Sequence, residues 1–102
     1  MRTGSADPSP DQDRDAAIRQ RLREFLLSTF YVPEVDHLFD DTSLLEAGIV
    51  DSTGILEILA FLRTDFGVNV EDSEVTPDNF ETIGRQVRFV ARKLAASSAQ
   101  LG

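Results

Sequence analysis

Residues 44–59, LLEAGIVDSTGILEIL, join an apolar loop to a helical pattern, and this junction decides the fold. The loop part ends at an Asp51-Ser52 step. After that step apolar residues recur at spacings of three and four, as they do on one face of a helix. We therefore predict a helix that begins at Ser52 and ends near Phe66, with Gly67 as its stop.

Other parts of the chain show helical patterning too. One apolar stripe predicts a first helix that Asp13 or Asp15 could cap and that Pro33 ends. A short helix over residues 77–80 is expected after Thr76, because proline suits the first helical position. A last helix is expected over residues 82–95. No stretch alternates like a strand, so the predicted fold class is all-α. We expect an antiparallel four-helix bundle, with three longer helices, one short helix and a long loop between the first two.

The loop over residues 32–51 is long for a domain of this size, and such loops are often functional. Ser43 and Glu46 resemble the capping pair of a short turn, which Gly48 would end. The apolar residues of the loop are expected to lie across the bundle. They are Val35, Leu38, Phe39, Leu44, Leu45, Ile49 and Val50.

The 102 residues suffice for one small domain, which we place at residues 13–95. Residues 1–12 hold two prolines and no apolar periodicity, and we expect them to form a disordered tail. Residues 96–102 are expected to be a flexible tail. The chain has no cysteine, no apolar run of membrane-spanning length and no signal-peptide pattern. These features favour a soluble, cytoplasmic protein.

Acidic residues are concentrated in the middle of the chain. The formal net charge is -8, which disfavours nucleic acid and anionic membranes as partners. Residues 34–81 hold thirteen acids and one base, Arg63. This bias is compatible with ordinary solvation charge. Because it surrounds Ser52, it equally indicates a docking surface for basic partners.

The residues do not favour an enzyme. The single histidine, His37, has neither a cysteine nor a second histidine with which to share a metal. Ser52 lacks the G-x-S-x-G context of a hydrolase nucleophile and has no evident base. The acidic segment 65–72 lacks the acid and the glycine that a calcium loop needs at its third and sixth positions. We therefore expect no catalytic residues and no metal site.

Ser52 has two interpretations from its position alone. It could be an ordinary N-cap, because serine is common there. Its hydroxyl could instead carry a phosphodiester, which the positive end of the helix dipole would stabilise by roughly 0.3–1 kcal/mol. Asp51 could help to hold a divalent cation while a phosphate-bearing group is delivered. The residues by themselves leave both interpretations open.

The sequence LLEAGIVDSTGILEIL resembles the signature of acyl and peptidyl carrier proteins, and the resemblance extends over roughly residues 13–95. It implies that Ser52 receives 4′-phosphopantetheine from coenzyme A, with Asp51 in a supporting role. It also implies that the helix after Ser52 recognises partner enzymes. The positions expected to face partners are Thr53, Leu56, Glu57, Ala60 and Arg63.

Several of these residues differ from those of many fatty-acid carriers. Thr53 and Gly54 stand where such carriers have leucine and an acid, Ala60 replaces a bulkier apolar residue, and Arg63 is basic where an acid is usual. The pattern resembles freestanding carriers of specialised pathways. The resemblance implies three kinds of partner for a monomeric, non-catalytic shuttle: a phosphopantetheinyl transferase, an acyl- or aminoacyl-activating ligase, and downstream transferases or tailoring enzymes.

Three alternatives remain. The chain could be a carrier of the fatty-acid type, an acidic helical adaptor without the prosthetic group, or a small hydrolase that uses Ser52. Loss of the Asp-Ser step would favour the adaptor, and this step is intact. A base beside Ser52 would be needed for the hydrolase.

Overall fold

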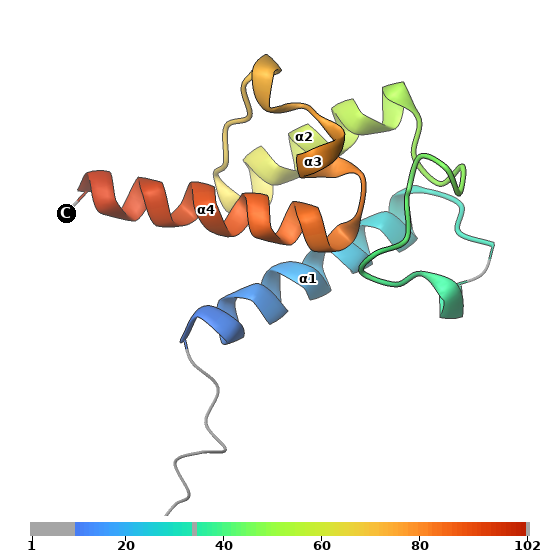
Figure 1. Ribbon diagram of the computed structural model, residues 1–102, viewed down its shortest axis with the longest axis horizontal. Helices are drawn as coiled ribbons and strands as arrows, with labels where there is room; N and C mark the ends of the chain where they lie inside the picture. Colours follow the sequence, from blue (N-terminus) through green and yellow to red (C-terminus); the bar gives the residue numbers. More distant parts are fainter. Residues whose placement is uncertain (1–9, 34, 102) are drawn as a thin grey trace, which may run out of the picture.

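The computed structural model describes residues 10–33 and 35–101, which form helices, turns and loops without a strand (Figure 1). This confirms the predicted all-α fold. Most of the predicted N-terminal tail, residues 1–9, lies outside the described residues, as does Gly102. The helices are α1 (Pro10–Thr29), α2 (Ser52–Phe66), α3 (Pro77–Phe80) and α4 (Ile83–Leu101), with short 3-10 turns at Val35–His37 and Asp72–Glu74.

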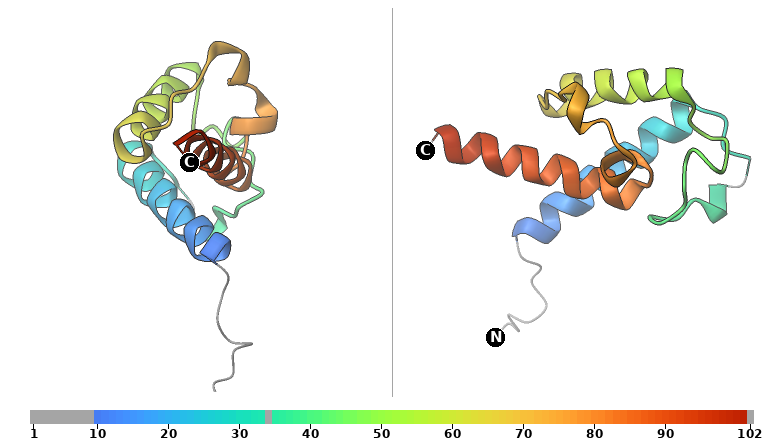
Figure 2. Two further views of the ribbon diagram at one scale, coloured as in Figure 1. Left: turned by 90° about the vertical axis from the view of Figure 1, so that its left-hand side faces the viewer. Right: turned by 45° about the horizontal axis from the view of Figure 1, so that its top comes forward.

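The bundle is built around α4. Figure 1 shows α1 running in the direction opposite to α2 and α4. The left view of Figure 2 looks along α4, with α1 and α2 on one side and the short α3 on the other. Among the helix pairs, α1 with α4 and α3 with α4 make the most extensive contacts. In the described parts of the chain, no helix combines the length and the apolar character needed to cross a membrane.

Every helix contributes to one core. The predicted stripes supply most of it, and the predicted loop residues Leu38, Leu44 and Val50 are buried as well. Gln86 is a buried polar residue that the pattern did not reveal, and its Nε2 donates to the Phe80 oxygen at 2.9 Å. The buried apolar residues are Ile18, Leu22, Leu26, Leu38, Leu44, Val50, Ile58, Leu62, Val68, Phe80, Ile83, Val87, Phe89 and Val90.

Part of the long loop is less buried than predicted. Val35, Phe39 and Leu45 were expected to lie across the bundle, but they are 43%, 56% and 45% exposed. Polar contacts, rather than these three apolar side chains, hold the loop against α1. The Arg23 guanidinium donates to the Leu38 and Val35 carbonyls. Apolar character alone therefore gave the wrong side for these three side chains.

Backbone contacts fasten the same loop to the start of α4. The Gly84 N–H donates to the backbone carbonyl oxygen of Asp40 at 2.9 Å. A Cβ at position 84 would lie 3.2 Å from that oxygen. The Leu44 N–H donates to the backbone carbonyl oxygen of Glu81 at 2.9 Å. The end of the loop that leads into α2 is thus held by the far end of the sequence.

Two helix boundaries differ from the prediction. The first helix begins at Pro10, before both of the expected caps, Asp13 and Asp15, and proline is compatible with a first helical turn. The last helix was expected to end near Ala95, but α4 continues to Leu101. Alanine favours helix and no glycine or proline interrupts the chain before Gly102, so weak amphipathicity there did not mean a helix end.

Candidate functional site

Ser52 is the first residue of α2, as predicted, but it is not the N-cap. Asp51 takes that role: its backbone is extended and its Oδ1 accepts from the Gly54 N–H at 2.8 Å. The Asp51 carbonyl accepts from the Ile55 N–H at 3.0 Å. The interpretation of Ser52 as a capping serine is therefore wrong, because the preceding carboxylate fills the same position.

The Ser52 hydroxyl is consequently available. The residue is exposed, and within the described part of the chain its hydroxyl makes no hydrogen bond. Because Ser52 and Thr53 are the first two helical residues, their N–H groups have no acceptor in the helix. An exposed hydroxyl thus stands at the positive end of a fifteen-residue helix.

A tight turn before α2 positions this serine. Gly48 has φ +74°, which glycine adopts without strain, and the N–H groups of Ile49 and Val50 donate to the Leu44 carbonyl at 3.0 and 3.1 Å. Leu44 and Val50 are buried. The buried ends of the turn hold it in the core, while Leu45 between them is exposed.

Gly54 belongs to the packing beneath the site. A Cβ at this position would lie 2.8 Å from Phe30 Cε1 and 3.1 Å from Val50 Cγ1. The first turn of α2 can approach the end of α1 this closely only with glycine. Gly54 stands where many fatty-acid carriers have an acid, but the residue is buried, so a partner enzyme cannot contact it.

The predicted partner-facing residues share one exposed side of α2. Their spacing along the helix places them away from the buried Ile58 and Leu62. Leu56 is 65% exposed. Leu45, on the turn before α2, is also an exposed apolar side chain, although its apolar character predicted an interior position. The five predicted residues, all of them exposed, are Thr53, Leu56, Glu57, Ala60 and Arg63.

Comparison with known proteins shows the family of the chain. No family model matches the chain. It is 33% identical over 75 residues to the probable acyl carrier protein PigG of Serratia sp., which covers 74% of this chain and 86% of the relative. The chain belongs to the acyl carrier protein family. This carrier protein is also 29% identical over 65 residues to D-alanyl carrier proteins of Streptococcus pyogenes, covering 64% of this chain and 81% of theirs.

The acidic surface of the carrier protein has two parts. Several acids are held in ion pairs: Arg19 with Asp40 at 2.6 Å, Arg85 with Glu81 and Lys93 with Glu74 at 3.0 Å, and Arg21 with Asp65. The bond with Asp65 raises the pKa of the Arg21 guanidinium above its ordinary value.

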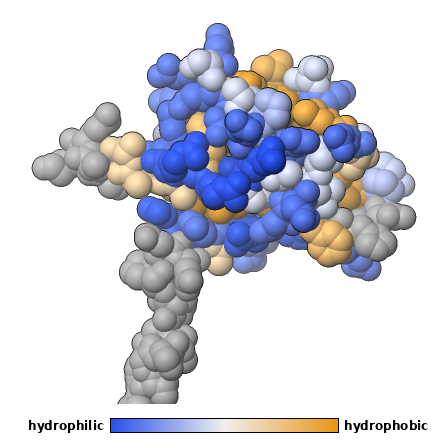
Figure 3. Space-filling view, in the orientation of Figure 1, coloured by the Kyte–Doolittle hydropathy of each residue, from blue (hydrophilic) through white to orange (hydrophobic). Residues whose placement is uncertain are grey.

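Acids nearer to Ser52 remain unpaired. Glu46, Asp51 and Glu57 form no ion pair within the described residues, and neither does the cation of Arg63. Charges without an ion pair therefore occur on the turn before Ser52 and on the exposed side of α2. On the face that Figure 3 shows, hydrophobic residues form small patches between hydrophilic ones.

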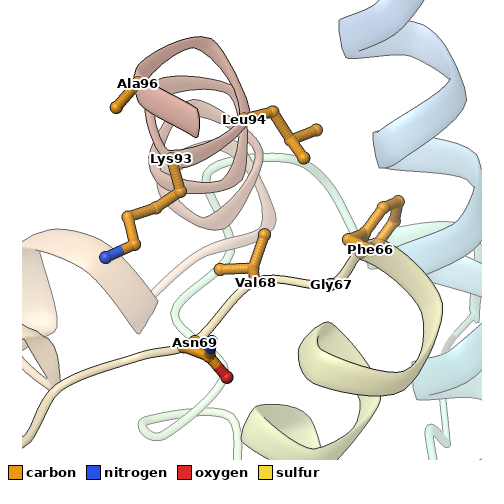
Figure 4. Close-up of a pocket in the computed structure, with 7 residues that line it drawn as sticks. All are labelled: Phe66, Gly67, Val68, Asn69, Lys93, Leu94 and Ala96. Atoms are coloured by element: carbon orange, nitrogen blue, oxygen red, sulfur yellow. The ribbon is translucent and has the colours of Figure 1, made fainter. Parts of the chain in front are cut away.

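A pocket of about 280 Å³ lies at the other end of α2 from Ser52 (Figure 4). Leu94 of α4 points toward Phe66 across it, and Lys93 extends to the other side. A helix of fifteen residues is about 22 Å long, so this pocket does not surround the serine. The carrier protein presents Ser52 on an open surface.

Proposed function

We propose that this protein is a freestanding acyl or aminoacyl carrier whose Ser52 bears 4′-phosphopantetheine transferred from coenzyme A. The observation that carries the proposal is the exposed hydroxyl at the first helical position, which Asp51 relieves of capping. A hydroxyl used as a cap would be tied to the backbone. Here it is free to form the phosphodiester.

The surroundings fit a phosphate-bearing group. The Ser52 and Thr53 N–H groups need acceptors, and the helix dipole attracts negative charge by roughly 0.3–1 kcal/mol at an exposed site. When bound, the arm supplies a thiol that holds cargo as a thioester. This chain has no cysteine of its own, so that thiol must be imported. The chain contributes position and recognition.

Asp51 has a second role in this proposal. Its Oδ1 is held by the Gly54 N–H, which fixes the orientation of the carboxylate. Its other oxygen makes no hydrogen bond among the described residues. Since Mg²⁺ is commonly bound by a carboxylate together with substrate phosphates, Asp51 is suited to hold the metal that accompanies coenzyme A.

The exposed side of α2 is the proposed recognition surface for three classes of partner. These are the phosphopantetheinyl transferase, an acyl- or aminoacyl-activating ligase, and downstream transferases or tailoring enzymes of a specialised pathway. Thr53, Ala60 and Arg63 are the residues that we expect to separate these enzymes from those that serve fatty-acid carriers. Docking would be brief and assisted by charge.

The test is incubation with coenzyme A, Mg²⁺ and a phosphopantetheinyl transferase, followed by measurement of the intact mass. Wild type should gain one phosphopantetheine, and Ser52→Ala should gain none. Ser73→Ala, at an exposed serine in the 3-10 turn after α2, is the matched control and should be modified like wild type. An unmodified wild type, or a modified Ser52→Ala, would refute the proposal.

A further inference from the structure

The side of α4 that faces solvent is basic, in a chain that is acidic as a whole. Over residues 83–96 the exposed residues are Arg88, Arg92, Ala95 and Ala96, which we name the α4 strip. Residues 82–102 contain no acid. Because Arg88 and Arg92 are four residues apart, they share one face of the helix, about 6 Å apart along its axis. On the face that Figure 3 shows, strongly hydrophilic residues gather over α4.

The two arginines of the α4 strip have no carboxylate partner within the described residues. The Arg88 guanidinium makes neither an ion pair nor a hydrogen bond there. Arg92 Nη2 donates to the neutral Asn79 Oδ1 at 3.1 Å, and its guanidinium lies 5.8 Å from the centroid of the Phe89 ring. These contacts orient Arg92 without neutralising it. The other two bases of this segment are paired, Arg85 with Glu81 and Lys93 with Glu74.

The α4 strip and Ser52 lie on different sides of the bundle. Asn79 belongs to α3, so its bond with Arg92 places the strip on the side of α4 that faces α3. The left view of Figure 2 shows α3 on one side of α4 and α1 and α2 on the other. Because α3 carries an exposed acid, Asp78, the basic area is confined to α4. A protein bound to the strip therefore leaves the exposed side of α2 free.

The charge and the shape of the α4 strip select an acidic helix as its occupant. Each guanidinium can bind a carboxylate through two parallel N–H groups. A separation of one turn matches carboxylates at positions i and i+4 of a second helix, and the small Ala95 and Ala96 let that helix approach closely. A membrane would need large apolar side chains, which the strip lacks. The net charge of -8 repels nucleic acid.

We propose that the α4 strip binds an acidic helix of a partner protein, with Asp or Glu residues four positions apart facing Arg88 and Arg92. This surface goes beyond the carrier function proposed above, because it involves neither Ser52 nor α2. A second protein can then hold the chain while an enzyme acts at Ser52.

Fluorescence anisotropy with a labelled alanine-based helical peptide that carries glutamate at every fourth position tests this at low ionic strength. Wild type should bind this peptide and not its glutamine counterpart. The double variant Arg88→Gln/Arg92→Gln should bind about tenfold more weakly, because two bidentate contacts are lost. Ala17→Glu/Gln20→Glu is the matched control, since it changes the net charge equally at exposed positions on α1. It should bind like wild type, and circular dichroism checks that both variants are folded.

Three results would overturn the proposal: no binding by wild type, wild-type affinity in the double arginine variant, or an equal loss of affinity in the control. Cosedimentation of wild type with phosphatidylglycerol vesicles, without peptide binding, would assign the α4 strip to a membrane instead. Self-association in sedimentation velocity that the arginine substitutions abolish would assign it to a second copy of the chain.

The separation of the two surfaces has its own test. A saturating concentration of the glutamate peptide should leave the rate of Ser52 modification by a phosphopantetheinyl transferase unchanged. Inhibition by the peptide would contradict a surface separate from that of Ser52. A wild type that binds the peptide but is never modified would refute the proposed function alone, because peptide binding requires no prosthetic group.

Discussion

At the scale of single residues, Asp51 caps α2, so the Ser52 hydroxyl does not have to serve both as the helix cap and as the proposed attachment point. Asp51→Ala should lower the free energy of unfolding by about 1 kcal/mol, because the Gly54 N–H loses its acceptor. Asp51→Asn should keep the stability, since asparagine caps equally well. Thermal or denaturant unfolding measures both. If Asp51→Ala is as stable as wild type, the cap does not contribute.

The same pair of variants tests the proposed metal role. Asp51→Asn keeps the cap but removes the charge that would hold Mg²⁺. Its rate of modification by the transferase should therefore fall well below wild type while its melting temperature stays unchanged. Equal rates for wild type and Asp51→Asn would remove the cation role from the proposal and leave Asp51 as a cap only.

Gly54 can be tested through its neighbour. Gly54→Ala places a Cβ 2.8 Å from the Phe30 ring, and overpacking of this kind typically costs about 1–3 kcal/mol. The helix preference of alanine offsets about 1 kcal/mol of this. We expect a net loss of stability that Phe30→Leu relieves, so the double variant should be more stable than additivity predicts. Additive effects would show that Phe30 is not the obstacle.

Glu74 gives the fold a defined acid sensitivity. The Glu71 N–H, followed by the Lys93 ammonium, lowers the pKa of Glu74 below its ordinary value. The ionised form is thus favoured in the folded state. The ionised Glu74 therefore stabilises the fold above the pKa of an unfolded glutamate, about 4.3. This stabilisation is lost as the pH falls through the lower pKa of Glu74 in the folded protein.

Glu74→Gln cannot titrate and should remove this sensitivity. At pH 7 the variant should be less stable than wild type by no more than about 1 kcal/mol, since both partners remain partly exposed. The difference in melting temperature should shrink toward pH 3. Glu46→Gln, on the exposed turn before Ser52, is the control. A difference that is constant from pH 7 to pH 3 contradicts the assignment.

At the scale of the helices, the boundaries of α2 were predictable because local signals coincide there. Asp51-Ser52 starts the apolar periodicity, and Gly67 takes the left-handed conformation that ends it, with φ +68°. The end of α4 had no such marker. Its Ala-rich continuation carries little amphipathic pattern, and intrinsic preference extended the helix beyond Ala95.

The loop and the site show what spacing cannot give. Val35, Phe39 and Leu45 look like core residues, but the Arg23 contacts and the Asp40–Gly84 contact determine which side chains face outward. Such contacts join distant parts of the chain. For the same reason the sequence could place Ser52 at a helix start, whereas the roles of Asp51 as cap and of Gly54 as packing required coordinates.

At the scale of the whole molecule, charge is divided between structure and surface. The ion-paired acids fasten helices and loops, and acids without an ion pair in the described residues include Glu46, Asp51 and Glu57, on the turn before Ser52 and on α2. We expect salt to weaken docking of a basic transferase, because the Debye screening length falls from about 10 Å at 0.1 M salt to about 3 Å at 1 M. KM should rise with salt while kcat and the melting temperature stay nearly constant. A KM that is independent of salt would contradict charge-assisted docking.

Because Asp51 provides the cap, position 52 can also be used for site-specific chemical labelling. Because Asp51, and not residue 52, caps α2, Ser52→Cys should fold as wild type does. It would introduce a single thiol into a chain that has no other cysteine. A thiol-reactive dye or cross-linker would then react at one known point. Partners could be trapped there from solution, whichever cargo the protein carries.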